Sequence, residues 1–280
     1  MFTARFWGVR GSIPCPGQDT VIYGGNTSCI EIRADDRLII VDLGSGARPL
    51  GDSLLKNDYK KNGKISADIF ITHTHWDHII GFPMFTPIYN TNTELSITGP
   101  VSLENNSLKD IFKAQFSRNF WPVRLDELSA KIKYKQISET TLDIGSGISV
   151  TSKLLNHPVT CLGYRFTYKG KSIAFVYDHE PFTKNAEEEN KKLIQFLKGA
   201  DILVHDAQYT CEKYEHHIGW GHSTMNNAIQ TALAAEVKKL VFFHHDPSHA
   251  DTQLKLIEKS YAKSAVKCIM AKEGMILEIK

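Results

Sequence analysis

The sequence predicts a mixed α/β fold in which sheets carry helices on their outer faces. The early part of the chain is a series of short apolar runs separated by glycine and asparagine clusters, as in strands joined by turns. The last third alternates amphipathic segments of helical spacing with short apolar runs. With 280 residues, 42% of them hydrophobic, the chain can bury one large core. We therefore expect a single domain over residues 1–280.

The spacing of apolar residues gives each element its expected range. Strands are expected at 4–9, 27–33, 37–41, 68–72, 148–154, 163–168, 172–177, 202–204 and 240–243. Helices are expected at 186–198, 223–237 and 251–263. The two-residue link Lys169-Gly170 predicts a hairpin. Prolines punctuate the stretch after Asp77, so about 84–140 is interpreted as an irregular insertion over one edge of the fold.

Composition narrows the function classes. The formal net charge of +2 gives no strong basic field toward nucleic acid, although a nucleic-acid substrate stays open. The five cysteines are scattered and never form C-x-x-C, which is typical of reduced packing residues. No apolar stretch approaches membrane length, and the N-terminus alternates like a strand. These features predict a cytoplasmic protein that does not enter a membrane.

The strongest chemical signal is the string His73-Thr74-His75-Trp76-Asp77-His78, which follows the apolar run Ile69-Phe70-Ile71. Four potential ligands within six positions at the end of a strand can aim nitrogen and oxygen donors at one cavity. Borderline metals such as zinc favour that ligand mix. The alternative is a histidine-rich surface loop that binds metal only adventitiously.

This H-x-H-x-D-H string resembles that of the metallo-β-lactamase superfamily, and the resemblance extends over nearly the whole chain. It implies a four-layer αβ/βα sandwich, with two mixed sheets face to face and the metal site at one edge. In that family an aspartate at the end of an upstream strand orients the metal loop, and Asp42 in Val41-Asp42-Leu43-Gly44 matches it. A plain strand-to-turn Asp-Leu-Gly is the alternative.

The resemblance also implies the remaining ligands, each of which closes an expected strand. His73, His75 and His157 would hold one metal, Asp77, His78 and His244 the other, and Asp178 would bridge the pair. Two divalent ions are thus expected, zinc first, with Mn²⁺ or Fe²⁺ as alternatives. A strand-end histidine can instead be a hydrogen-bonded structural residue. His245 competes with His244, since strand alternation lets only one face the metals; the ribonuclease Z-like branch favours His244.

Ligand types separate the chemistries within the superfamily. Di-iron redox relatives carry glutamate where this chain has His75, and zinc β-lactamases carry cysteine in place of Asp178, so both functions lose support. The stretches 203–209 and 219–224 resemble those that mark the phosphodiesterase branch. There, His222 would protonate the leaving alkoxide and Asp206 would support it, and Asp77 completes the expected catalytic group. The alternative for this segment is a helix cap at Ser223 that His222 merely precedes.

The departures from ribonuclease Z favour a smaller substrate. The stretch between His157 and Asp178 has room for little more than a hairpin, so a long tRNA-gripping arm is not expected. Arginine can fork onto phosphate and aromatic rings can stack on a base. The candidate substrate contacts are accordingly Arg10, Asn26, His179 and the aromatic group Phe116, Phe120 and Trp121, each with a structural role as its alternative.

The sequence thus predicts a binuclear metal-dependent hydrolase, a phosphodiesterase that acts on small diesters such as cyclic nucleotides. A thioester or lactone hydrolase with the same ligands is the first alternative, and the His222 segment separates the two. A metal-bound scaffold or sensor without activity is the second. The expected partner is the small phosphodiester, and a homodimer stays open.

Overall fold

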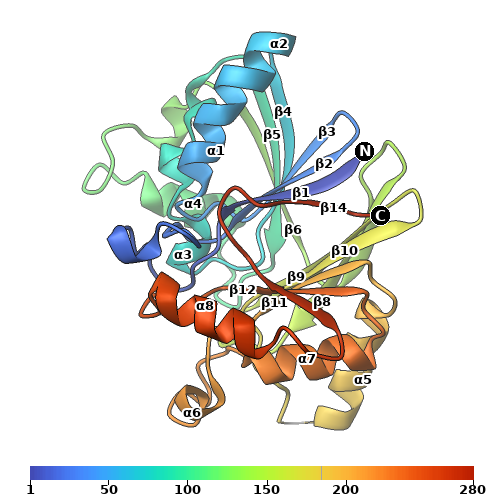
Figure 1. Ribbon diagram of the computed structural model, residues 1–280. Coiled ribbons are helices and arrows are strands. Elements are labelled where there is room, and N and C mark those ends of the chain that lie inside the picture. Colours follow the sequence, from blue (N-terminus) through green and yellow to red (C-terminus); the bar gives the residue numbers. More distant parts are fainter. Residues whose placement is uncertain (184) are drawn as a thin grey trace.

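Two seven-stranded sheets lie face to face, and helices cover their outer faces (Figure 1). The computed structural model describes residues 1–183 and 185–280. This arrangement confirms the four-layer sandwich expected from the sequence. In spatial order the first sheet contains β14 (Ile276–Glu278), β1 (Phe2–Gly8), β2 (Cys29–Ala34), β3 (Arg37–Val41), β4 (Ile65–Phe70), β5 (Thr93–Pro100) and β6 (Lys131–Ile137).

The second sheet, like the first, contains both parallel and antiparallel strand pairs. It contains β13 (Lys267–Met270), β12 (Lys239–Phe243), β11 (Ile202–Asp206), β10 (Lys171–Val176), β9 (Cys161–Tyr168), β8 (Ile148–Leu155) and β7 (Thr140–Asp143). Strands β10 to β13 pair in parallel, whereas β7 to β10 pair antiparallel. In the first sheet β3 to β6 are parallel. The parallel strands place several carboxyl ends at one edge of the sandwich.

The helices divide between the two outer faces. They are α1 (Ala47–Leu54), α2 (Lys60–Asn62), α3 (Trp76–Ile79), α4 (Leu108–Gln115), α5 (Ala186–Leu197), α6 (Cys211–Tyr214), α7 (Met225–Ala234) and α8 (Asp251–Ser260). In Figure 1, α1 and α4 lie on the side of the first sheet, and α5, α7 and α8 on the side of the second. Within the described residues, no helix is both long and apolar enough to span a membrane.

Alternation along the strands builds the core between the sheets. Phe2, Ala4 and Phe6 of β1 are buried while the residues between them are half-buried, so one face of the strand points inward. Tyr164 and Phe175 of the second sheet belong to the same buried cluster. Two further apolar clusters fill the space beneath the helices on either face.

The expectation of an irregular insertion at about 84–140 needs correction. This stretch supplies β5 and β6, and β5 lies inside the first sheet, parallel to both β4 and β6. Leu95 and Ile97 are buried and alternate with polar residues, a strand pattern that the surrounding prolines obscured. Pro100 stands at the end of β5, where its missing N–H does not interrupt the sheet.

Candidate metal centre and active site

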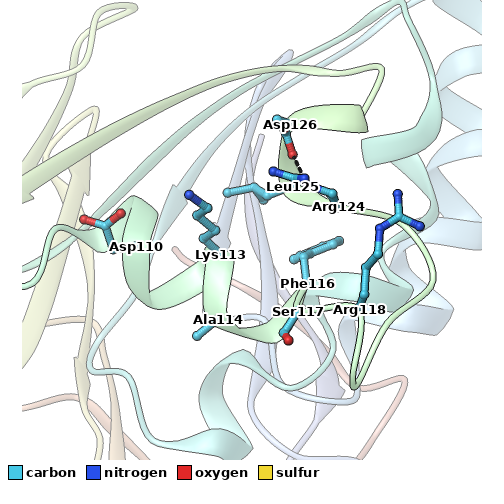
Figure 2. A pocket seen from close by; sticks show the side chains of 9 residues that line it. All are labelled: Asp110, Lys113, Ala114, Phe116, Ser117, Arg118, Arg124, Leu125 and Asp126. Atoms are coloured by element: carbon cyan, nitrogen blue, oxygen red, sulfur yellow. Dashed lines mark hydrogen bonds and ion pairs between the residues drawn. The ribbon is translucent and has the colours of Figure 1, made fainter.

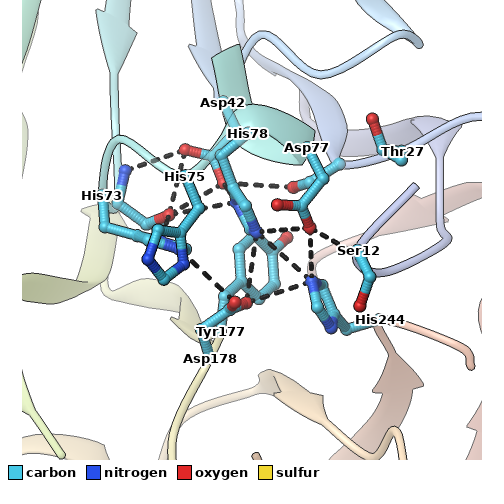
Figure 3. A network of polar contacts seen from close by, with 12 residues as sticks. Ser12, Thr27, Asp42, His73, His75, Asp77, His78, Tyr177, Asp178 and His244 are labelled. Carbon is cyan, nitrogen blue, oxygen red and sulfur yellow. Dashed lines mark hydrogen bonds and ion pairs between the residues drawn. The ribbon is translucent and has the colours of Figure 1, made fainter. Parts of the chain in front are cut away.

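The candidate site lies at the edge where several strands of both sheets end. The metal-loop residues His73–His78 follow β4, Asp178 follows β10, and His244 directly follows β12 (Figure 3). Asp42 directly follows β3, which pairs in parallel with β4. Because parallel strands end at the same edge, residues far apart in the sequence meet here.

Three of these strand-end residues adopt left-handed backbone conformations. The φ angles are 60° at Asp42, 45° at Asp178 and 60° at His244. Residues with a Cβ atom rarely adopt this conformation, and it concentrates at functional sites. The alternation of side chains along each strand therefore ends at these residues. At each of them the left-handed backbone turns the side chain into the site.

The first cluster joins three histidines and one carboxylate. The candidate ligand atoms of His73, His75, His157 and Asp178 all lie within 4.8 Å of one another. His157 Nε2 is 3.1 Å from His75 Nδ1, and His73 Nε2 is 3.4 Å from Asp178 Oδ2. These are the residues that the superfamily resemblance assigned to one metal, together with the bridging aspartate.

The second cluster shares Asp178 with the first. Its other members are Asp77, His78 and His244, and the same 4.8 Å limit holds for the ligand atoms. His78 Nε2 and His244 Nε2 each lie 3.2 Å from Asp178 Oδ1, whereas the distance to His73 Nε2 given above is from Oδ2. The two oxygens of one carboxylate thus face different clusters, so Asp178 could contribute to holding an ion at each (Figure 3).

The chemistry of the donors fits divalent cations. His78 Nε2 lies 3.2 Å from His244 Nε2, so two imidazole nitrogens face one another and at most one proton fits between them. His73 Nε2 is buried without a hydrogen-bond partner among the described residues. Buried polar atoms seldom lack partners, and imidazole with carboxylate is a ligand set for zinc and similar metals. The buried clusters are thus consistent with a binuclear metal site.

The protonation preferences also suit metal binding. Burial lowers the pKa of His73 far below its usual value and brings that of His157 to about 4, so both are neutral at physiological pH. Metals bind the neutral imidazole. Burial also opposes the charged form of His78, but the carboxylates of Asp77, Asp178 and Asp42 outweigh it and raise its pKa. Without a cation, His78 would therefore keep a proton.

Hydrogen bonds to the outer ring nitrogens orient three of the histidines. His78 Nδ1 lies 2.7 Å from Asp42 Oδ2, and His157 Nδ1 lies 3.0 Å from the carbonyl oxygen of Gly221. His244 Nδ1 lies 2.9 Å from Gln208 Oε1. An acceptor at Nδ1 fixes the proton there and leaves Nε2 free to face the cluster.

Asp42, for which the resemblance implied an orienting role, contacts the metal loop at several points. Besides His78, its carboxylate accepts the backbone N–H of Thr72 at 2.8 Å and the hydroxyl of Ser28 at 3.1 Å. Sequence reasoning missed Gln208. Its only sequence signal is its position two residues after Asp206, whose Oδ1 accepts the Gln208 backbone N–H at 3.0 Å.

His222 lies beside the second cluster and is paired with Asp206. Its Nδ1 is 2.8 Å from Asp206 Oδ2, and its ring stacks on that of His244 with centroids 5.0 Å apart. Burial opposes the charged form, but Asp206 and Asp178 outweigh it and raise the pKa of His222 to about 9. His222 also forms a third potential metal-binding group with Asp178, Asp206 and His244.

A buried carboxylate that sequence reasoning missed holds the loop before His222. Glu180 accepts the backbone N–H of Gly219 at 2.8 Å and that of Gly221 at 2.9 Å, and the hydroxyl of Tyr214 donates to it at 2.8 Å. Gly221 has a φ of 85°, and a Cβ there would lie 2.1 Å from His157 Nδ1. The loop therefore requires glycine where it passes the ligand ring.

The structure gives Arg10 a different place from the expected substrate contact. Its side chain is fully buried and donates to the carbonyl oxygens of Gly24 at 2.7 Å, Asp246 at 3.1 Å and His249 at 2.6 Å. Nε and Nη1 of the guanidinium thus join loops, whereas Nη2 is buried without a hydrogen-bond partner among the described residues. Contact of Arg10 with phosphate stays a prediction that this burial and these bonds do not support.

Asn26 and His179 also make internal contacts. Asn26 Nδ2 donates to Glu273 at 3.0 Å, and Asn26 Oδ1 accepts from the Ser45 hydroxyl at the same distance. His179 is buried, and its Nδ1 accepts the Asn156 backbone N–H at 3.2 Å. Contact of either side chain with substrate stays a prediction that these bonds do not support.

His245 and the aromatic group have separate places. His245 turns away from the clusters: its Nε2 lies 2.9 Å from the carbonyl oxygen of Ala271, and its ring meets Tyr23 edge-on. Phe116 is buried in the core beneath α4. Phe120 and Trp121 line a cavity with Trp76.

Comparison with known proteins places the chain in a family. Residues 49–245, well over half of the chain, match the family model described as "Beta-lactamase superfamily domain". The ribonuclease Z of Picrophilus torridus is 23% identical over an alignment 300 positions long, gaps included, which covers 92% of this chain and 90% of the relative.

Solved structures show the same fold. Human tRNase Z, short form, superposes with a TM-score of 0.71 at 20% identity, over 99% of each chain. A diphosphatase from the PhnP family superposes with a TM-score of 0.67 at 17% identity, over 100% of this chain and 98% of the other. The family match over most of the chain, together with the shared fold, shows that the chain belongs to the metallo-β-lactamase superfamily, and ribonuclease Z is among the sequence relatives it resembles.

Proposed function

We propose that this protein is a binuclear metal-dependent phosphodiesterase that acts on small phosphodiesters. The observation that carries the proposal is Asp178, whose two oxygens face separate clusters directly beside the His222–Asp206 pair. Two divalent ions held by these residues would supply the means to activate water and to stabilise the attacking and leaving oxygens of an in-line displacement. The sequence relatives named ribonuclease Z support phosphodiester chemistry.

His222 is the proposed general acid. Because Nδ1 donates to Asp206, the proton available for transfer is the one on Nε2. The carboxylates of Asp206 and Asp178 raise the pKa of His222 to about 9, outweighing burial. Bound cations would oppose these carboxylates and lower the pKa toward neutrality, where a general acid is most effective.

Asp206 and Asp77 are held in place for their roles. Asp206 accepts the backbone N–H of Gln208 at 3.0 Å through one oxygen, which leaves the other to orient His222. Asp77 Oδ2 accepts the backbone N–H of Ser12 at 2.8 Å and lies 3.0 Å from His244 Nε2. Both carboxylates therefore face the site in a fixed orientation.

The chain around the site favours a small substrate. Between His157 and Asp178 the structure contains the strands β9 and β10, which form a hairpin, and little else. Between Asp178 and His205, the described residues form only helix α5 and the start of β11. These described segments contain no long arm that could hold a folded RNA. We therefore infer that the substrate is a small diester that binds at the metal site without contacts to such an arm.

Turnover by the metal-loaded protein tests the function. Purified protein with two equivalents of zinc or manganese should hydrolyse bis(p-nitrophenyl) phosphate faster than a thioester or a lactone of similar size. Asp178→Asn should abolish this turnover, because the bridging carboxylate is lost. Faster cleavage of the thioester or lactone would assign the alternative hydrolase function. No turnover of any substrate with both metals bound would favour a sensor.

A further inference from the structure

An apolar cavity adjoins the metal loop. It has a volume of about 550 Å³ and lies between α3 and α4, with walls formed mainly by Trp76, Ile80, Pro83, Ile111, Phe120 and Trp121. Trp76 and Ile80 are one helical turn apart and thus share a face of the helix. A cavity of this size is typical of small-molecule sites.

Trp76, which lines the cavity, is also adjacent in the sequence to candidate ligands of both metal clusters. It stands between His75 of the first cluster and Asp77 of the second. Consecutive Cα atoms are about 3.8 Å apart. The backbone of Trp76 therefore lies within one residue of a candidate ligand on each side. A molecule whose phosphate reached the clusters could extend its organic part into the cavity.

The lining selects a planar, uncharged group. Trp76 is 69% exposed and Phe120 is 74% exposed, which leaves two large aromatic rings free for stacking. Trp121 Nε1 donates to the Tyr89 hydroxyl at 3.0 Å, which holds its ring in place. Asp110 on the rim would repel a phosphate.

Gln115 adds one polar group to this lining. Its Oε1 is buried and has no hydrogen-bond donor in the described part of the chain, while its Nε2 donates to the Ile79 carbonyl oxygen at 3.2 Å. This bond ties α4 to the chain just after the metal loop.

A second pocket on α4 is a weaker candidate for binding the substrate. Figure 2 shows its basic residues Lys113, Arg118 and Arg124. Arg118 pairs with Glu127 at 2.8 Å, and Arg124 pairs with Asp126 at 3.1 Å, so acidic neighbours offset two of the three charges. The apolar cavity is therefore the better-defined extension of the site.

We propose that the cavity binds a planar aromatic group of the substrate, of the nucleobase type, while the phosphate occupies the metal clusters. The inference rests on the proposed function for the position of the phosphate, but not for the cavity itself. Stacking of one base on aromatic side chains contributes about 1–3 kcal/mol, or roughly a 5- to 150-fold gain in affinity.

Calorimetric binding of a matched pair of ligands tests the inference. On the zinc-loaded protein, adenosine 5′-monophosphate should bind at least about tenfold more tightly than ribose 5-phosphate, which carries the same phosphate without the base. Trp76→Ala should bring this ratio close to one and leave the affinity for ribose 5-phosphate unchanged. Trp76→Phe should keep most of the ratio, because it keeps an aromatic face.

Two further variants serve as controls. Phe120→Ala should lower the ratio as well, whereas Leu256→Ala, which removes another exposed apolar side chain on α8, should not. A ratio near one in the wild type, or one that neither Trp76→Ala nor Phe120→Ala lowers, would overturn the proposal. If the ratio behaves as expected but no diester is hydrolysed, the cavity site stands and the phosphodiesterase function fails.

Discussion

His222 is the residue on which the proposed chemistry turns, because its surroundings allow two roles. Its hydrogen bond to Asp206 and its exposure of 8% suit a proton donor at the edge of the site. Its ring also stacks on His244, and its donor atom lies within a potential metal-binding group. Removal of a proton donor leaves the metal content unchanged, whereas removal of a ligand lowers it. The two roles therefore predict different metal contents for a variant that lacks the His222 side chain.

His222→Ala should retain both metals and lose a factor of roughly 10²–10⁴ in turnover of a diester with an alkoxide leaving group. The defect should be small for a p-nitrophenolate, which departs readily without a proton. Steady-state kinetics on both esters, together with metal analysis, measure the difference. Asp206→Asn should give a milder form of the same pattern. Loss of a metal, or an equal defect on both esters, would contradict the role of acid.

The adjacent histidines at the end of β12 should respond in opposite ways. His244→Ala removes a group that lies 3.0 Å from Asp77 and 3.2 Å from Asp178, so the variant should bind about one metal fewer per chain and lose most activity. His245→Ala removes a group that bonds to Ala271, so it should keep both metals. Elemental analysis of the two purified variants decides between them, and metal loss in His245→Ala alone would reverse the assignment.

At the scale of elements, the loop after β1 connects the two sheets beside the site. Arg10 forms isolated bridges with Thr27 and His245, and its guanidinium donates to carbonyl oxygens of two separate loops. The next residue, Gly11, packs so closely on His244 that a Cβ would lie 2.3 Å from its Nδ1. This loop therefore packs against the Nδ1 side of the His244 ring and restricts its position.

Arg10→Met should destabilise the fold by on the order of 3 kcal/mol or more, because the buried carbonyl oxygens of Gly24 and His249 lose their donor and that of Asp246 keeps only the His249 N–H. Urea unfolding of the metal-free variant measures the effect without interference from metal binding. Arg10→Lys should recover only part of the loss, since one ammonium cannot reproduce the planar fork. A stable variant with weakened substrate binding would restore the role of phosphate contact.

The elements with clear periodicity could be predicted from the sequence. The strand expected at 37–41 is β3, and the helix expected at 186–198 is α5. β5 and β6 were missed because prolines and lysines outweighed their alternation. Within the site, the ligands of the metal loop are close in the sequence, so the sequence could predict that they lie together. Gln208 and Glu180 could not, because they act through loops whose proximity depends on the tertiary fold.

At the scale of the whole molecule, the clusters join the two sheets. Asp77 and His78 follow a strand of the first sheet, whereas His157, Asp178 and His244 follow strands of the second. Cations held at both clusters would therefore link the two halves of the sandwich. Ligands that bind only the folded state stabilise it in proportion to the logarithm of their concentration.

Removal of the metals should lower the melting temperature. At one hundred times the dissociation constant, each ion contributes about 2.7 kcal/mol, which corresponds to several degrees for a chain of this size. Chelation followed by titration with zinc, monitored by calorimetry, should restore the transition with two equivalents per chain. Asp178→Asn should show a much smaller shift, since it removes the shared ligand. Restoration with one equivalent would contradict the binuclear site.

The left-handed residues at the strand ends have a consequence for the metal-free protein. Each such conformation costs on the order of 1–3 kcal/mol, and Asp42, Asp178 and His244 all adopt it at one edge. Glycine relieves this cost, so metal-free His244→Gly should unfold at a higher temperature than metal-free His244→Ala, although glycine usually destabilises. Equal or reversed melting temperatures would show that the backbone there is relaxed.

The same strain bears on how the molecule opens. When no cation offsets it, this edge should exchange its amide hydrogens before the rest of the sandwich does, because local opening starts where the native contacts are least favourable. In a cell short of the metal, proteases would then cleave this protein first at the edge that carries the candidate metal centre.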